Sequence, residues 1–259
     1  MLRQKLYRFL IELTNSRLTS YLLKRLALSK KSKFLIKSFA NTYQIDLAEM
    51  EKKIEEYTSL HDFFTRRLKP NSRTFESSPN TIISPVDGKI EEFGKINEHS
   101  VIHAKNRPYS VIEMLGNDEA ANKYINGHFI VIYLSPQNYH RIHCPLNGKV
   151  VRQVTLGGKS YPVNNLGLKY GKDPLSKNFR IVSEIQNNNK HYSLIKVGAM
   201  FVNSIELLHS SELVEKGEEV GYFSFGSTVV LLFEEGSVEL SDLKSKQKVR
   251  LGDKIGVWK

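Results

Sequence analysis

The chain has 259 residues with 40% hydrophobic and 10% aromatic content, so it can bury a substantial core as one large domain or as a small module plus one domain. Its single cysteine, Cys144, excludes an intrachain disulfide framework and fits a reducing compartment. The formal net charge of +11 indicates a nucleic acid or an anionic surface as partner. Residues 1–40 hold ten Lys or Arg and one acid, a net charge of +9, which leaves +2 for residues 41–259. This concentration favours an anionic surface and argues against nucleic-acid binding.

The basic N-terminal end has apolar residues at helical spacing in three segments. These are residues 2–13, a segment that Asn15 or Ser16 can cap, and a short segment around Phe34–Phe39. No uncharged apolar run is long enough to span a bilayer, and charges interrupt any signal-peptide core. The pattern predicts helices that lie in the plane of an anionic membrane surface. A solvated helical hairpin packed on its own domain is the alternative.

Two further helices are predicted over residues 47–57 and 60–68, followed by a polar linker over residues 70–79. From Ile82 onward, short β-branched and aromatic runs alternate with Gly, Pro and Asn, which is typical of a mainly antiparallel β structure. The polar stretch over residues 164–178 is expected to form a long loop. The sequence therefore predicts an α+β protein, with a helical membrane-association region over 1–70 and a β-rich domain over 80–259.

Two segments of the β-rich part share one pattern, Pro-apolar-Asp/Asn-Gly-Lys-apolar. They are Ser84–Ile90 and Cys144–Val150. Asp-Gly or Asn-Gly after Pro forms a tight turn that can begin a strand. The repetition favours an intertwined, internally duplicated β sandwich or barrel, and a coincidence between two similar turns is the alternative.

The dipeptide Gly226-Ser227 precedes an apolar run, Val229–Phe233, that is typical of a buried strand. A Gly within a strand pattern often marks a bulge or a close approach of the backbone. A hydroxyl directly after it can reach the Gly226 carbonyl, so Ser227 could attack the peptide bond that precedes it. Because Gly-Ser pairs are also common in bulges and turns, the dipeptide alone leaves a purely structural interpretation open.

The flanks of this dipeptide, Lys216–Phe223 and Phe225–Thr228, closely resemble the C-terminal signature of phosphatidylserine decarboxylases. Further blocks that resemble the family are Asp62–Pro70, Ser84–Gly88 and Tyr139–His143. The ordered set spans residues from about 60 to 236. The chain departs from the commonest family pattern at Phe225, where Leu is usual, and at Val202–Ile205, where many members have Val-Gly-Ser-Ile.

The resemblance implies a maturation step. His143, oriented by Asp87, takes the proton of Ser227, whose Oγ attacks the Gly226 carbonyl. The resulting ester undergoes β-elimination to dehydroalanine. Water then hydrolyses the dehydroalanine, which releases ammonia and leaves a pyruvoyl group at position 227. The implied products are a larger fragment, 1–226, and a smaller fragment, 227–259, which stay associated through a shared sheet.

The resemblance also implies the reaction. The pyruvoyl ketone forms a Schiff base with the amine of phosphatidylserine and draws electrons from the bond to the carboxylate, so that carbon dioxide leaves and phosphatidylethanolamine is released. His140 is expected near the substrate carboxylate, where it helps to donate a proton. The implied partner is phosphatidylserine in an anionic membrane. The lysine-rich composition and the absence of a targeting segment favour a peripheral position on the cytoplasmic side of the cell membrane. A homodimer is compatible with the resemblance.

Other interpretations follow from the residues alone. Asp87 lies in a turn where Asp is a routine turn former, and His140 and His143 could be hydrogen-bonded structural groups. Metal ligation by these histidines and Cys144 is disfavoured, because the spacing differs from that of zincins and Pro145 follows at once. No metal is therefore predicted. Gly226-Ser227 does not lie in the Gly-x-Ser-x-Gly elbow of α/β hydrolases, so a conventional lipase is also disfavoured. A histidine phosphocarrier or binding module with a duplicated β sandwich, and a purely structural membrane-peripheral protein, are the remaining alternatives.

Overall fold

The computed structural model of the chain describes residue 22 and residues 25–199, 205–208, 211–224 and 227–259. The helix predicted over residues 2–13 and the predicted scission residue Gly226 lie outside these described residues. The described part is a mixed α+β structure of mostly antiparallel sheets with short helices, as predicted. None of its helices is long and apolar enough to cross a bilayer.

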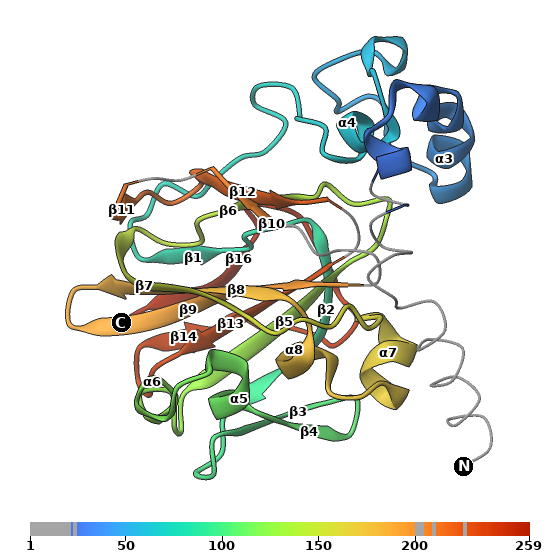
Figure 1. The fold of residues 1–259 in the computed structure, drawn as a ribbon. Coiled ribbons are helices and arrows are strands. Elements are labelled where there is room, and N and C mark those ends of the chain that lie inside the picture. The colour runs from blue at the N-terminus through green and yellow to red at the C-terminus, as the bar shows by residue number, and fades with distance from the viewer. Residues whose placement is uncertain (1–21, 23–24, 200–204, 209–210, 225–226) are drawn as a thin grey trace.

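Short helices near the N-terminus form a small layer above the sheets (Figure 1). They are η1 (Lys30–Phe34), α3 (Leu35–Tyr43), η2 (Ile54–Glu56) and α4 (Leu60–Phe64). They have a core of their own, made of Ile36, Ala40, Ile45, Met50, Tyr57 and Phe63. Helix α4 begins at Ser59 because the Ser59 hydroxyl accepts the Asp62 N–H at 3.1 Å, a typical N-cap.

The helices predicted over residues 47–57 and 60–68 are much shorter than expected. Residues before η2 run instead beside the segment that follows α4. Met50 forms an antiparallel bridge with Leu68, and the Glu51 N–H donates to the Arg67 carbonyl at 3.0 Å. Hydrogen bonds to a remote segment replace the local helical ones, which the apolar spacing within one segment cannot reveal.

The centre of the protein is an eight-stranded sheet with the order β11-β7-β8-β9-β13-β5-β2-β15. Its strands are β2 (Gly88–Lys95), β5 (His128–Leu134), β7 (Gly148–Leu156), β8 (Arg180–Asn187), β9 (Lys190–Gly198), β11 (Leu213–Val214), β13 (Ser227–Phe233) and β15 (Lys248–Val249). Every neighbouring pair is antiparallel. Since β11 and β15 remain as its two edges, the described sheet is open, and the predicted sandwich is confirmed without the closed barrel.

Smaller elements cover this sheet. Two three-stranded sheets and a hairpin are formed by β1 (Thr81–Ile83), β16 (Lys254–Trp258), β14 (Val238–Leu240), β10 (Ile205–Leu207), β12 (Glu219–Phe223), β6 (Arg141–His143), β3 (Val101–Ala104) and β4 (Arg107–Ser110). The remaining helices are α5 (Val111–Leu115), α6 (Asp118–Asn122), α7 (Asn165–Tyr170) and α8 (Pro174–Lys177). The stretch predicted as a long loop thus contains two short helices, and the Asn164 side chain caps the first by accepting the Gly167 N–H at 2.9 Å.

The strand order has the same pattern from either edge, and the two Pro-x-Asp/Asn-Gly turns lie at matching places. Gly88 begins β2 and pairs with Val249 of the edge strand, while Gly148 begins β7 and pairs with Val214 of the other edge strand. Each strand has a register shift two residues after its Gly. A Cβ on Gly88 would lie 2.7 Å from a carbonyl of the neighbouring strand, and so would one on Gly148, so both positions require glycine. These matches are those of an internally duplicated domain.

The two halves are interleaved. In one half, β8 and β9 form a tight hairpin in which Asn187 pairs with Lys190. In the other half, the corresponding strands β5 and β13 pair in the same way, with Leu134 opposite Ser227. Between Leu134 and Ser227 the chain forms the half that contains β8 and β9, and then returns to the half that contains β5. Ser227 is therefore the first residue after the inserted half.

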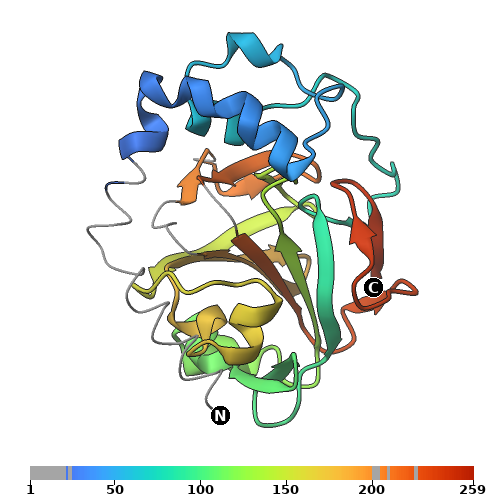
Figure 2. The same ribbon diagram turned by 90° about the vertical axis from the view of Figure 1, so that its right-hand side faces the viewer.

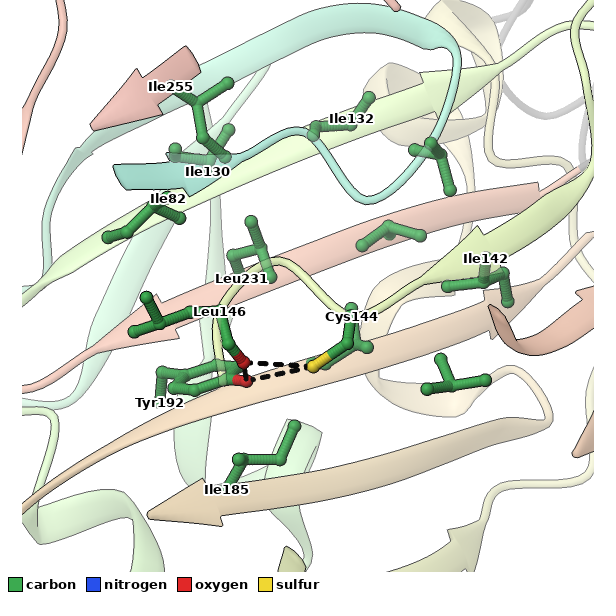
Figure 3. Packing of buried hydrophobic residues seen from close by; sticks show 14 of the residues in the cluster. Ile82, Ile130, Ile132, Ile142, Cys144, Leu146, Ile185, Tyr192, Leu231 and Ile255 are labelled. Atoms are coloured by element: carbon green, nitrogen blue, oxygen red, sulfur yellow. Dashed lines mark hydrogen bonds between the residues drawn. The ribbon is translucent and has the colours of Figure 1, made fainter. Parts of the chain in front are cut away.

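Both faces of the eight-stranded sheet are buried. One face packs against the sheet β10-β12-β6, over a cluster that includes Ile142, Cys144 and Leu231 (Figure 3). The opposite face is covered by α5–α8 and the β3–β4 hairpin, below the sheet in Figures 1 and 2. The helical layer lies beyond β10-β12-β6, on the side away from the large sheet.

Candidate active site

Ser227 lies at the start of β13, a strand that is buried at every position. It pairs with Leu134 of β5 on one side and with Gly198 of β9 on the other. Because side chains alternate along a strand, Ser227 shares a sheet face with Val229 and therefore faces the sheet β10-β12-β6. Its side chain is fully buried, and its Oγ has no hydrogen-bond partner within the described structure. A buried hydroxyl without a partner costs about 1–3 kcal/mol, so this placement needs a functional reason.

Asp87 lies in the turn before β2, where it is held by positive and polar donors. Its carboxylate accepts from Arg73 Nη2 at 2.7 Å and Nε at 3.3 Å, and from the Leu251 N–H at 2.8 Å. Arg73 in turn contacts Glu49 at 2.9 Å. The Asp87 carboxylate is therefore engaged by a guanidinium and a backbone amide in the uncut chain.

His143 ends strand β6 in a mostly buried position. Its Nδ1 lies 2.7 Å from the Gly217 carbonyl, which can only accept, so Nδ1 carries the proton and Nε2 has the lone pair. The Tyr139 hydroxyl donates to Nε2 at 3.2 Å. Burial lowers the pKa of His143 and keeps the ring neutral. The ring lines a cavity of about 340 Å³ that it shares with Arg73, Tyr139 and Glu219.

His140 is completely buried and stacks on Phe64 of α4, with the ring centres 4.0 Å apart. Its Nδ1 donates to the Asn138 carbonyl at 2.8 Å, which leaves a lone pair on Nε2. That Nε2 has no hydrogen-bond partner among the described residues. Burial, with a smaller contribution from the nearby Arg66, lowers the pKa of His140 to about 3. The ring is neutral at physiological pH, so donating a proton requires that it first gain one.

The structure brings His140 close to the segment before Ser227 and leaves His143 farther along the same strand. The His140 carbonyl accepts the Phe223 N–H at 3.0 Å, whereas His143 is the register partner of Glu219, at the far end of β12. In the described structure no hydrogen bond joins Asp87, His143 and Ser227 to one another. In this arrangement Arg73 and Leu251 hold the Asp87 carboxylate, and the Gly217 carbonyl holds His143 Nδ1.

The Cys144 side chain contacts other residues than the two histidine side chains do. Its thiol points into the core, where it donates to the Leu146 carbonyl at 3.0 Å and lies 3.3 Å from the Tyr192 hydroxyl (Figure 3). Burial raises the pKa of this thiol to about 11. The neighbouring Cys144 and His143 thus face opposite sides of their strand, and the thiol is a structural group.

Arg66, Arg73 and Tyr139 are site residues that the sequence did not single out. Arg66 and Tyr139 lie inside the blocks that resemble the family, but nothing in the sequence separates Arg66 from its neighbour Arg67. The structure does: Arg66 is 4% exposed, while Arg67 is exposed to solvent. Burial of one member of an Arg-Arg pair depends on the packing of α4 against the loop before β6, which local sequence does not encode.

Comparisons with known proteins agree with one another. The family model described as phosphatidylserine decarboxylase matches residues 60–257. A phosphatidylserine decarboxylase proenzyme of Bacillus thuringiensis (strain Al Hakam) is 52% identical over 255 residues, which cover 98% of this chain and 97% of that protein. Proenzymes of the same name from Bacillus cereus (strains 03BB102 and ATCC 10987 / NRS 248) match with the same identity and coverage.

Proposed function

Because the chain belongs to the phosphatidylserine decarboxylase family, we propose that it cuts its own backbone between Gly226 and Ser227 and converts Ser227 into a pyruvoyl group. The enzyme converts phosphatidylserine to phosphatidylethanolamine and carbon dioxide. The observation that carries the proposal is the Ser227 Oγ, fully buried and without a partner at the first position of a central strand. A histidine phosphocarrier needs an exposed ring to receive phosphate, and both candidate histidines are buried or nearly so.

Self-cleavage transfers one proton from the Ser227 Oγ to a base. Oγ then bonds to the Gly226 carbonyl carbon, the C–N bond breaks, and the nitrogen takes up a proton. We assign the base to His143. Three features support it: its tautomer is fixed by Gly217, its Nε2 carries the lone pair, and burial keeps the ring neutral. The ring must leave the Tyr139 hydroxyl to act.

Asp87 is assigned as the group that orients and stabilises His143 once protonated. Its turn is connected to His143 through the backbone, since the His143 N–H donates to the Pro85 carbonyl at 2.9 Å. Its charge also acts on the His143 ring in the direction that raises the pKa of the imidazole. A carboxylate held by Arg73 can serve this purpose without being protonated itself.

A ketone at position 227 supplies an electrophilic carbonyl that takes the substrate amine and accepts the electron pair released with carbon dioxide. The chain's own residues bind and orient the substrate around it. His140 is the proposed proton carrier, because its Nε2 is buried and unpaired and its backbone carbonyl accepts the N–H of Phe223, shortly before Ser227 in sequence. The pyruvoyl group fits this place, since Ser227 faces the interior and not solvent.

The two proposed fragments would remain together without a covalent link. Every residue of β13 in the smaller fragment pairs with both β5 and β9 of the larger one. The five apolar side chains Val229–Phe233 are fully or almost fully buried, and each contributes about 1.5–3 kcal/mol on burial. Breaking one peptide bond leaves this packing and the strand pairing in place. The cut enzyme is therefore expected to keep its fold.

An intact-mass spectrum of the purified, active protein tests the proposal. It should show two components, 1–226 and a fragment starting at residue 227 that is lighter by one ammonia than a chain with an N-terminal serine. Borohydride should reduce the ketone and abolish turnover. A turnover-competent enzyme that is one uninterrupted chain, unaffected by borohydride, would exclude this function.

We further propose that the helical region, residues 1–70, holds the β-rich domain, residues 80–259, at the surface of an anionic membrane. Several apolar side chains near its basic residues are exposed, with Phe34 the most exposed at 76% and Leu22, Leu26 and Leu28 at about half. Lysines flank them at positions 30, 31, 33 and 37. An apolar surface bordered by lysines is typical of a helix that lies on a membrane.

Replacing Lys30, Lys31 and Lys33 by Glu is expected to weaken binding to phosphatidylserine-containing vesicles by about a hundredfold or more, since each lysine contributes about 1 kcal/mol at such a surface. Vesicle co-sedimentation at low and high salt measures the effect, which salt should reduce. The matched control reverses three lysines near the C-terminus, Lys244, Lys246 and Lys254. Equal loss in both triple variants would show a general charge effect and contradict the proposal.

A further inference from the structure

Arg66 is a buried cation whose hydrogen-bonding capacity is largely unused. The residue is 4% exposed. Its Nη2 donates to the carbonyls of Gln137 at 2.9 Å and Asn138 at 3.1 Å, but Nε and Nη1 have no partner within the described structure. The guanidinium carbon lies over the Phe63 ring, 5.6 Å from its centre. Across the described residues, no carboxylate lies within ion-pair distance of Arg66.

Burying a guanidinium with unpaired N–H groups and no counter-ion lowers the stability of the fold. A buried donor without a partner costs about 1–3 kcal/mol, and a buried charge without a counter-ion costs more. Burial lowers the pKa of Arg66, which expresses the same penalty. Fixing a loop through two carbonyls would need only a neutral donor. The positive charge and the unused N–H groups of Nε and Nη1 therefore point to an anion as the ligand of Arg66.

Arg66 and His140 converge on one atom. The Asn138 carbonyl accepts from both Arg66 Nη2 and His140 Nδ1, so the guanidinium and the imidazole lie next to each other. Arg66 Nε and Nη1 and His140 Nε2 are all buried and unpaired within the described structure. The two adjacent side chains, the Arg66–His140 pair, thus have unused polar atoms next to each other.

The Arg66–His140 pair is connected to the strands around Ser227 in two separate ways. The loop that Arg66 holds begins directly after Leu134, the register partner of Ser227. The Phe223 N–H, shortly before Ser227 in sequence, donates to the carbonyl of His140. The unused guanidinium donors thus belong to the surroundings of the proposed pyruvoyl group.

The geometry points to Arg66 as the residue that binds the phosphodiester of the phospholipid headgroup while the headgroup amine reacts at position 227. The inference rests on the proposed function. A guanidinium offers a planar pair of N–H donors that matches two phosphate oxygens. A phosphodiester also supplies the negative charge that this buried site lacks, and it favours the protonated form of His140 beside it.

The phosphodiester and the carboxylate are the two anions of the headgroup, and the reaction distinguishes them. The carboxylate loses its charge when carbon dioxide leaves, so an ion pair with it would stabilise the ground state more than the transition state and slow the reaction. The phosphodiester keeps its charge throughout. Binding it lowers KM at no cost to the chemical step. Arg66, a buried cation without a carboxylate partner among the described residues, is therefore assigned to the phosphate.

The test compares Arg66→Met and Arg66→Lys with the unaltered enzyme. Charge-assisted hydrogen bonds contribute about 1.5–3 kcal/mol, so KM for phosphatidylserine in mixed micelles should rise about ten- to hundredfold in Arg66→Met, with less change in kcat. Two soluble inhibitors, both with a reactive amine, separate the anions. Glycerophosphoethanolamine, with a phosphodiester and no carboxylate, should lose the same factor, while L-serine, with a carboxylate and no phosphate, should not. Arg66→Lys should recover part of the loss.

Intact mass of each variant separates this inference from the proposed function, because self-cleavage should be complete in both. The matched control is Arg107→Met, which removes an arginine paired with Asp173 on the opposite side of the large sheet. Loss of L-serine inhibition alone would assign the carboxylate to Arg66 and overturn the inference. Unchanged inhibition by both compounds in a cleaved variant would show that Arg66 only supports the loop. Failure of the unaltered chain to cleave would instead refute the proposed function.

Discussion

Replacing Ser227 by alanine should leave a single uncut chain of 29.7 kDa without decarboxylase activity. Without Oγ there is no nucleophile for the Gly226 carbonyl and no oxygen for the ester. The fold should be unaffected or slightly more stable, since the substitution removes a buried hydroxyl that has no partner. Intact mass, an activity assay and thermal unfolding of the same sample measure all three expectations.

Ser237→Ala is the matched control for this variant. Ser237 is also a fully buried serine of the smaller fragment, but its hydroxyl donates to the Glu234 carbonyl at 2.7 Å. The control should be cleaved and active, with stability reduced by about 1 kcal/mol for the lost hydrogen bond. A Ser227→Ala protein that still separates into two fragments would place the scission elsewhere.

Replacing His143 by alanine should slow self-cleavage by about a hundredfold to ten-thousandfold, the usual contribution of a general base. His140→Ala should still be cleaved and should lose turnover, because we assign His140 to the later step. The measurement is the rate at which the uncut chain disappears after refolding or cell-free synthesis. The exposed His99 provides a control, and His99→Ala should cleave at the normal rate.

The pH dependence of cleavage tests the same assignment. A base acts in its neutral form, and burial lowers the pKa of His143 below its ordinary value of 6.5. The rate should therefore fall to half of its value at mildly alkaline pH only below pH 6.5, where the ring gains a proton. A rate that already falls well above pH 6.5 would contradict a buried, neutral His143 as the base. Normal cleavage of His143→Ala together with failure of His140→Ala to cleave would also contradict this assignment.

Much of the fold was predictable because it depends on local chemistry. The two Pro-x-Asp/Asn-Gly turns indicated the duplication, since a tight turn followed by a strand is specified within a few residues. The run Val229–Phe233 indicated a buried strand by its apolar side chains alone. Interleaving of the two halves was not predictable in detail, because strand partners lie far apart in sequence. The same holds for Met50 and Leu68, whose pairing replaces a predicted helix.

The site was predictable as a set of residues and not as a geometry. Ser227, Asp87 and the two histidines came from motifs. Their hydrogen-bond partners, Arg73 and Gly217 among them, depend on which loops meet in space. Burial of charged residues is also invisible locally. Lys196, inside a β strand, is 1% exposed, donates to Ser183 Oγ at 2.6 Å, and has a pKa that burial lowers to about 7.

The interleaved arrangement determines what scission does to the architecture. In one repeat a tight turn joins β8 and β9, so a break there would remove the short link between two paired strands. At the equivalent point of the other repeat, the link between Leu134 and Ser227 is an entire repeat, so a break beside Ser227 opens no hairpin. The proposed ketone would consequently arise at the junction between the two repeats, flanked by β5 of one and β9 of the other.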